Sequence, residues 1–135
     1  MGNTVYTDVS LKEGNEEVNK WFTELLEKML IPESERTERT GNYKPVINLI
    51  KKWRAIEDFP GGWSNIDNIG CSRCYITGTE GHTIFFESNG CHPEQLIEAL
   101  AEEAQGYDSS VVFEYVYYDE LGEDRGGAAV RKRDL

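Results

Sequence analysis

The residues best suited to chemistry are the three cysteines and the two histidines, four of which fall into two close pairs. Cys71 and Cys74 form a Cys-x-x-Cys pair, and Cys91 is followed directly by His92. Thiolates and imidazoles are the usual ligands of a structural zinc ion, so these four residues have the right types for a Cys₃His site. If residues 71–74 form a strand, however, Cys71 and Cys74 point to opposite faces, because side chains alternate along a strand. We therefore expect no metal and no cofactor, with zinc as the alternative.

Without a metal, Cys74 is best interpreted as a small buried hydrophobe and Cys91 as a loop residue. The odd number of cysteines and the lack of a signal-peptide pattern favour reduced thiols in a cytoplasm. The Cys-His neighbours could suggest a nucleophile with its base, but such a pair meets in space and not as adjacent residues. We therefore expect a protein that is not an enzyme. The alternative is an enzyme with a pocket near Trp63, Arg73 and Tyr75.

The charge balance favours a basic partner. Lys and Arg number 14 against 25 Asp and Glu, which gives a net charge of −11. Such a chain repels nucleic-acid phosphates and anionic lipid surfaces, so we expect neither a nucleic acid nor a membrane as a direct partner. Glu94, Glu98 and Glu102 recur every four residues, and Glu103 extends the row. This row is either an ordinary solvated face or a decoy that mimics the spacing of nucleic-acid phosphates.

The apolar pattern predicts the helices that position these residues. Apolar residues at spacings of three and four over residues 16–30 predict an amphipathic helix. A second helix is expected to begin near Pro45, a residue suited to the first turn. A third covers residues 93–105, with Gly106 as its stop.

Alternating and β-branched stretches predict the strands. Residues 4–11 alternate so that Val5, Thr7, Val9 and Leu11 share one face. Residues 70–77 and 83–87 form a hairpin whose turn of four or five residues contains Gly78 and Gly81. The remaining expected strands are residues 110–118, with Val111, Phe113, Tyr115 and Tyr117 on one face, and the short edge strand 128–132.

The resulting order is β-α-(α)-β-β-α-β, which apart from the extra helix is the split βαβ or ferredoxin-like arrangement of the α+β class. Right-handed crossovers place both main helices on one face of an antiparallel sheet and leave the other face uncovered. We expect a single domain over residues 1–135, with long loops at 31–43 and 57–67 and a frayed tail at 131–135.

Several short motifs resemble a known family. The start Met-Gly-Asn-Thr-Val-Tyr and the stretch at residues 67–76 resemble the Met-x-Asn-x-Val-Tyr start and the Asn-x-Gly-x-Lys-Trp/Cys strand of the YubB-type ferredoxin-like domain family of small phage and plasmid proteins. The family's Trp-Ser-Pro-Pro segment is replaced here at residues 89–93. The resemblance implies a ferredoxin-like fold and a phage or mobile-element origin, but no defined reaction. From the resemblance we expect a small accessory protein in the cytoplasm of a host cell.

The uncovered sheet face is expected to carry aromatic side chains. RNA-recognition modules of this topology stack bases on such residues, but the net charge of −11 argues against that use. Exposed aromatic patches also mark protein interfaces, so we expect a basic host protein, or a second copy of the chain, to dock on this face or on the acidic third helix. Alternatively, the loop at 31–43 or the loop at 57–67 folds over the face. The residues expected at the contact are Glu94, Glu98, Glu102, Glu103, Tyr6, Arg73 and Tyr75, together with either the Phe113, Tyr115 and Tyr117 set or Tyr118.

Overall fold

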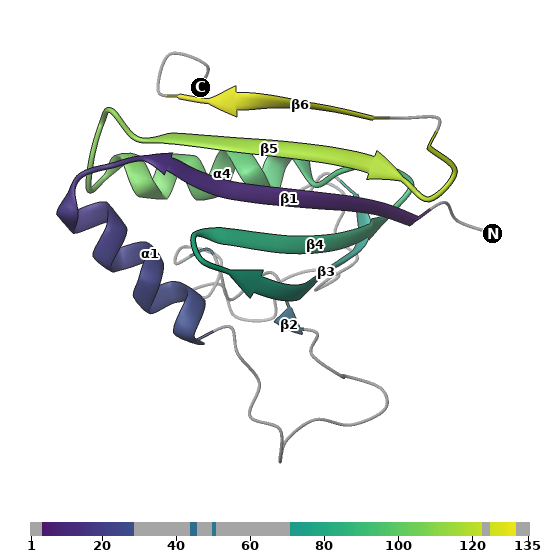
Figure 1. Ribbon diagram of the computed structural model, residues 1–135, viewed down its shortest axis with the longest axis horizontal. Helices are drawn as coiled ribbons and strands as arrows, with labels where there is room; N and C mark the ends of the chain where they lie inside the picture. Colours follow the sequence, from purple (N-terminus) through teal and green to yellow (C-terminus); the bar gives the residue numbers. More distant parts are fainter. Residues whose placement is uncertain (1–3, 29–43, 46–49, 51–70, 123–124, 132–135) are drawn as a thin grey trace.

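The computed structural model describes residues 4–28, 44–45, 50, 71–122 and 125–131 (Figure 1). Within them the fold is α+β, with an antiparallel sheet and two helices. The sheet has six strands in the order β2-β3-β4-β1-β5-β6, and all neighbouring strands are antiparallel. The elements along the chain are β1 (Thr4–Glu13), α1 (Glu16–Lys28), β2 (Lys44–Pro45), β3 (Ser72–Glu80), β4 (Thr83–Asn89), α4 (Glu94–Gln105), β5 (Val112–Asp119) and β6 (Arg125–Val130).

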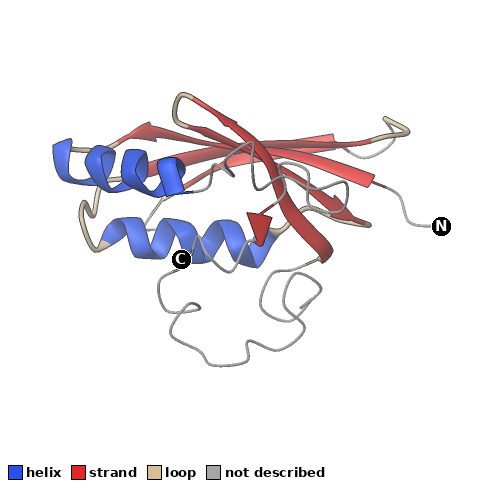
Figure 2. Cartoon of the chain, turned by 90° about the horizontal axis from the view of Figure 1, so that it is seen from below, coloured by secondary structure: helices blue, strands red, loops and turns tan. Residues whose placement is uncertain are grey.

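Both helices lie against the same face of the sheet (Figure 2). The alternation predicted for β1 is confirmed, because Val5, Thr7, Val9 and Leu11 are buried while the residues between them are only half-buried. One core cluster joins this face to the apolar stripes of both helices. Its members include Val18, Phe22, Leu25 and Leu26 of α1 and Leu96, Ile97, Leu100, Ala101 and Ala104 of α4.

The β3–β4 hairpin is tighter than predicted. Its turn consists of Gly81 and His82, and Gly81 has φ of +59°, a left-handed conformation that favours glycine. Gly78 was expected in the turn, but it lies within β3 next to a register shift that follows Ile76. A bulge there adds one residue to β3 without ending the strand, which is why this glycine is not a turn residue.

The second predicted helix is not found where it was expected to begin. Pro45 instead ends the two-residue strand β2, which pairs with Ile76 and Tyr75 of β3. The rest of that predicted helix lies outside the described residues, as do the predicted loops at 31–43 and 57–67 and most of the predicted tail. Of the two helices that the structure describes, neither combines the length and the apolar character that crossing a membrane requires.

Candidate functional site

The sheet face turned away from the helices carries a mixture of aromatic and charged side chains. Tyr6 from β1 and Tyr118 from β5 contact each other there, with ring centroids 5.2 Å apart. Tyr118 is 50% exposed and Val116 is 56% exposed. Of the two aromatic sets that the sequence allowed on this face, the structure therefore selects Tyr118. Phe113 belongs to the buried core on the opposite face, and Tyr115 packs against that core.

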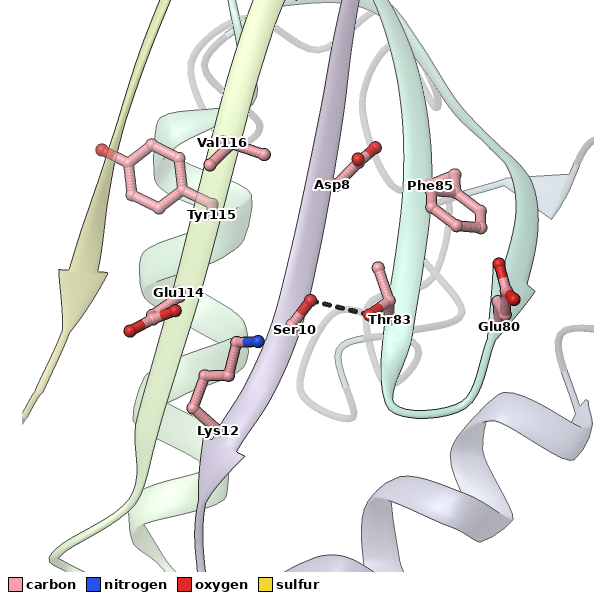
Figure 3. A pocket seen from close by; sticks show the side chains of 9 residues that line it. All are labelled: Asp8, Ser10, Lys12, Glu80, Thr83, Phe85, Glu114, Tyr115 and Val116. Atoms are coloured by element: carbon pink, nitrogen blue, oxygen red, sulfur yellow. Dashed lines mark hydrogen bonds between the residues drawn. The ribbon is translucent and has the colours of Figure 1, made fainter.

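A hollow of about 370 Å³ crosses this open face from β3 to β5 (Figure 3). Three carboxylates from three strands line it: Asp8 of β1, Glu80 of β3 and Glu114 of β5. Lys12 is the one basic residue among the described lining residues, so these have an excess of negative charge. We call this feature the open-face hollow. Its arrangement suits a cationic group better than an anion.

Asp8 of β1 lies between the β4 and β5 sides of the open-face hollow because of the strand register. Its Cα partners are Phe85 on β4 and Val116 on β5, two apolar neighbours. Burial raises the pKa of the Asp8 carboxyl above its ordinary value, and no hydrogen bond or cation in the described part of the chain offsets this effect. The nearby hydroxyl oxygens of Ser10 and Thr83 are 2.7 Å apart and hydrogen-bond each other (Figure 3). Among the described residues, Asp8 is therefore a partly desolvated carboxylate without a counterion of its own.

Replacing Asp8 with asparagine is expected to raise the free energy of unfolding at neutral pH by no more than about 0.5 kcal/mol. The pKa of Asp8 is higher in the folded than in the unfolded chain, so folding disfavours the charged form. This penalty is present above the folded-state pKa and vanishes below the unfolded-state pKa, where both states are protonated. Thermal unfolding of the original protein and of Asp8→Asn, at neutral and at strongly acidic pH, measures this penalty. An equal difference at both pH values would contradict the assignment.

The predicted acidic row lies on the other side of the molecule. Glu94, Glu98 and Glu102 are exposed on α4, and Glu103 is half-buried. No basic residue occurs in α4, whose sequence is Glu-Gln-Leu-Ile-Glu-Ala-Leu-Ala-Glu-Glu-Ala-Gln. Because α4 covers the sheet face opposite Tyr6, the structure separates the two predicted contact surfaces (Figure 2).

Two predicted contact residues, Arg73 and Tyr75, can be placed only by their backbone. Both lie in β3, where Tyr75 pairs with Glu87 of β4. Their side chains lie outside what the structure describes, and so does Trp63. The predicted enzyme pocket near these residues therefore stays a prediction.

The geometric argument against the Cys-x-x-Cys pair was wrong. Cys71 and Cys74 are both buried in the same core cluster, and their thiols hydrogen-bond each other. Between Ser72 and Tyr75 the register of β3 against β4 shifts by one residue, and this bulge breaks the strict alternation of faces. Cys74 is a buried small side chain and Cys91 is exposed, as the interpretation without a metal predicted.

The fourth alternative zinc ligand, His92, packs against two tyrosines of β5. The imidazole of His92 stacks on Tyr117, with ring centroids 4.1 Å apart and an interplanar angle of 10°. Among the described residues, no group of three or more His, Cys, Asp or Glu side chains is arranged to hold a metal ion.

The residues of the open-face hollow were not singled out from the sequence. The alternation of residues 4–11 already placed Asp8 and Ser10 opposite the apolar face, which is a usable signal. What the alternation lacks is the register between strands, which sets Glu114 on one side of Ser10 and, beyond Thr83, Glu80 on the other.

Comparisons of this chain with models of protein families, with curated proteins and with solved structures find no match. The chemistry of the chain's own surfaces is therefore the basis for a functional assignment. The open-face hollow combines carboxylates, hydroxyl groups and two aromatic residues, Phe85 and Tyr115, in a shallow depression. These groups can hold an ammonium or guanidinium ion by hydrogen bonds, charge and ring contact.

Proposed function

We propose that this protein acts by binding another protein, and that the open-face hollow receives lysine or arginine side chains of that partner. The single observation that carries the proposal is that Asp8, Glu80 and Glu114 line one hollow, in which Lys12 is the only basic residue among those that the structure describes. The net charge of −11 would steer a basic partner toward the protein before contact.

The surroundings of Asp8 explain why a cation would be held there. A desolvated carboxylate gains more from a charge-assisted hydrogen bond than one in bulk water, because the local dielectric is lower. Phe85 is the Cα partner of Asp8 and offers a ring face to a cation. An RNA strand would instead bring its phosphates against these carboxylates, so the same charges disfavour the RNA-binding use of such a sheet.

We also propose that the sheet is of the ferredoxin-like split βαβ type. In support of this, β1, α1, β3, β4, α4 and β5 follow one another as β-α-β-β-α-β, and their strands stand in the order β3-β4-β1-β5. In this view β2 and β6 are additions to the two edges. The YubB-type resemblance adds a phage or plasmid origin, and the partner is then a protein of the bacterial host.

The test is a titration of the full-length protein with an oligo-arginine peptide, followed by amide chemical shifts. We expect shifts concentrated on β1, β4 and β5 around the open-face hollow, and weaker binding as salt is added. A triple variant, Asp8→Asn with Glu80→Gln and Glu114→Gln, should bind the peptide about tenfold more weakly, which corresponds to about 1.4 kcal/mol.

The matched control removes the same amount of charge from the opposite side of the molecule. Glu94→Gln with Glu98→Gln and Glu102→Gln changes the net charge equally, so general electrostatic attraction falls by the same amount in both proteins. We expect the control variant to keep most of the affinity. Equal losses in the two variants, or shifts concentrated on α4, would overturn the proposal in favour of the acidic row.

A further inference from the structure

The three cysteines gather at one end of the sheet, where β3 begins and the segment between β4 and α4 passes. Cys71 immediately precedes β3, and Cys91 lies in the short connection before α4. Cys71 is 1% exposed and Cys74 is 0% exposed, whereas Cys91 lies at the surface. The cluster thus contains a buried dithiol with a third thiol that solvent reaches.

One hydroxyl group connects the buried pair to the exposed thiol. The Ser88 hydroxyl donates a hydrogen bond to the carbonyl oxygen of Cys91, 2.6 Å away. The same hydroxyl is a hydrogen-bond partner of the Cys71 thiol, which also hydrogen-bonds Cys74. Cys71 therefore lies between Cys74 and the Cys91 segment.

The environments of Cys71 and Cys74 differ in a way that suits exchange chemistry. Hydrogen bonding, mainly with Cys74 and to a smaller extent with Ser88, lowers the pKa of the Cys71 thiol, although burial opposes this effect. The pKa of the Cys74 thiol is raised, mainly by burial and to a smaller extent by the neighbouring Cys71. Cys71 is accordingly the member of the pair that carries thiolate more readily, and thiolate is the attacking species in disulfide exchange.

We propose that this cluster is a site of thiol–disulfide exchange, in which Cys71 and Cys74 become a disulfide and Cys91 is the entry point for a low-molecular-weight disulfide. The Cys91 thiolate attacks one sulfur of the incoming disulfide, forms a mixed disulfide and releases one small thiol. The Cys71 thiolate then attacks the Cys91 sulfur and releases the second small thiol. Finally, the Cys74 thiolate attacks the Cys71 sulfur and restores the Cys91 thiol. The incoming disulfide is reduced by two electrons as the dithiol is oxidised.

The test uses the reduced full-length protein and oxidised glutathione, with the products followed by intact mass and peptide mapping. We expect a product that lacks two hydrogens, carries no glutathione, and links Cys71 to Cys74 while Cys91 remains a thiol. Cys91→Ser should form the same disulfide at least about tenfold more slowly, because the buried pair loses its exposed entry thiol. Cys74→Ala should stop at a Cys71–Cys91 disulfide.

Two results would overturn the proposal. One is a wild-type product that keeps glutathione on Cys91 while Cys71 and Cys74 remain free thiols. The other is an unchanged rate of Cys71–Cys74 oxidation in Cys91→Ser. Because Cys91 is exposed, its serine variant is expected to fold normally, and circular dichroism checks this. The test therefore does not depend on the buried Cys74→Ala variant being stable.

Discussion

Replacing Phe113 with alanine is expected to lower the free energy of unfolding by about 3–5 kcal/mol. Phe113 is fully buried on β5, on the sheet face that the helices cover. Its ring meets Phe22 of α1 edge to face, with centroids 5.5 Å apart and planes at 74°. Truncation removes this contact and leaves a cavity between α1 and the sheet, which the surrounding backbone can close only in part. Urea denaturation followed by circular dichroism measures the loss.

The matched control for Phe113 lies on the same strand but on the open face. Val116→Ala shortens a side chain that is 56% exposed, so we expect a change within about 0.5 kcal/mol. A loss below about 1 kcal/mol for Phe113→Ala, or similar losses for both variants, would contradict the packing of both helices on one side of the sheet.

Hydrophobic periodicity predicted the elements whose pattern is local. The alternation around Val5 and Val9 is sufficient to predict β1, because one face of this strand is buried along its whole length. The stripe containing Val18 and Phe22 is equally sufficient for α1, because side chains at that spacing share one face of a helix. The acidic residues Glu16 and Glu17 in its first turn agree with the helix dipole.

Features that depend on two strands at once could not be predicted in the same way. The bulge between Ser72 and Tyr75 and the one after Ile76 exist only relative to β4, which lies later in the chain. Each extra residue changes which side chains share a face. For this reason strict alternation placed Cys71 and Cys74 on opposite faces, and Gly78 was assigned to the turn although it lies within β3.

The same limit applied to the open-face hollow. Its members come from β1, β3, β4 and β5, and they meet because of the register that pairs Asp8 with Phe85 and with Val116. A row of acids along one helix is visible in a sequence, since its spacing is local. Carboxylates that neighbouring strands contribute one at a time cannot be recognised in this way. The sequence therefore predicts a contact surface at Glu94, Glu98 and Glu102 but none at Asp8.

Replacing Gly127 with alanine is expected to lower the free energy of unfolding by about 1–3 kcal/mol and to loosen β6 first. Gly127 pairs with Val116 of β5 at the edge of the sheet. A Cβ atom at this position would collide with the backbone carbonyl oxygen of Tyr115 and would lie 3.1 Å from the Cα of Val116. Backbone atoms cannot rotate away, so the strand itself has to move. Hydrogen exchange of the β6 amides measures the loss of pairing.

The neighbouring glycine provides the matched control, because its added methyl group would meet only a side chain. A Cβ atom on Gly126 would lie 2.8 Å from the Tyr117 hydroxyl oxygen, at the far end of a ring that can turn aside. We therefore expect Gly126→Ala to lower the free energy of unfolding by less than about 1 kcal/mol and to leave β6 exchange nearly unchanged. Equal exchange rates in the two variants would contradict the close backbone approach of β6 to β5. If β6 opens in Gly127→Ala while the rest of the sheet keeps its protection from exchange, β6 is a unit that unfolds independently. The open-face hollow then keeps its structure when β6 is open.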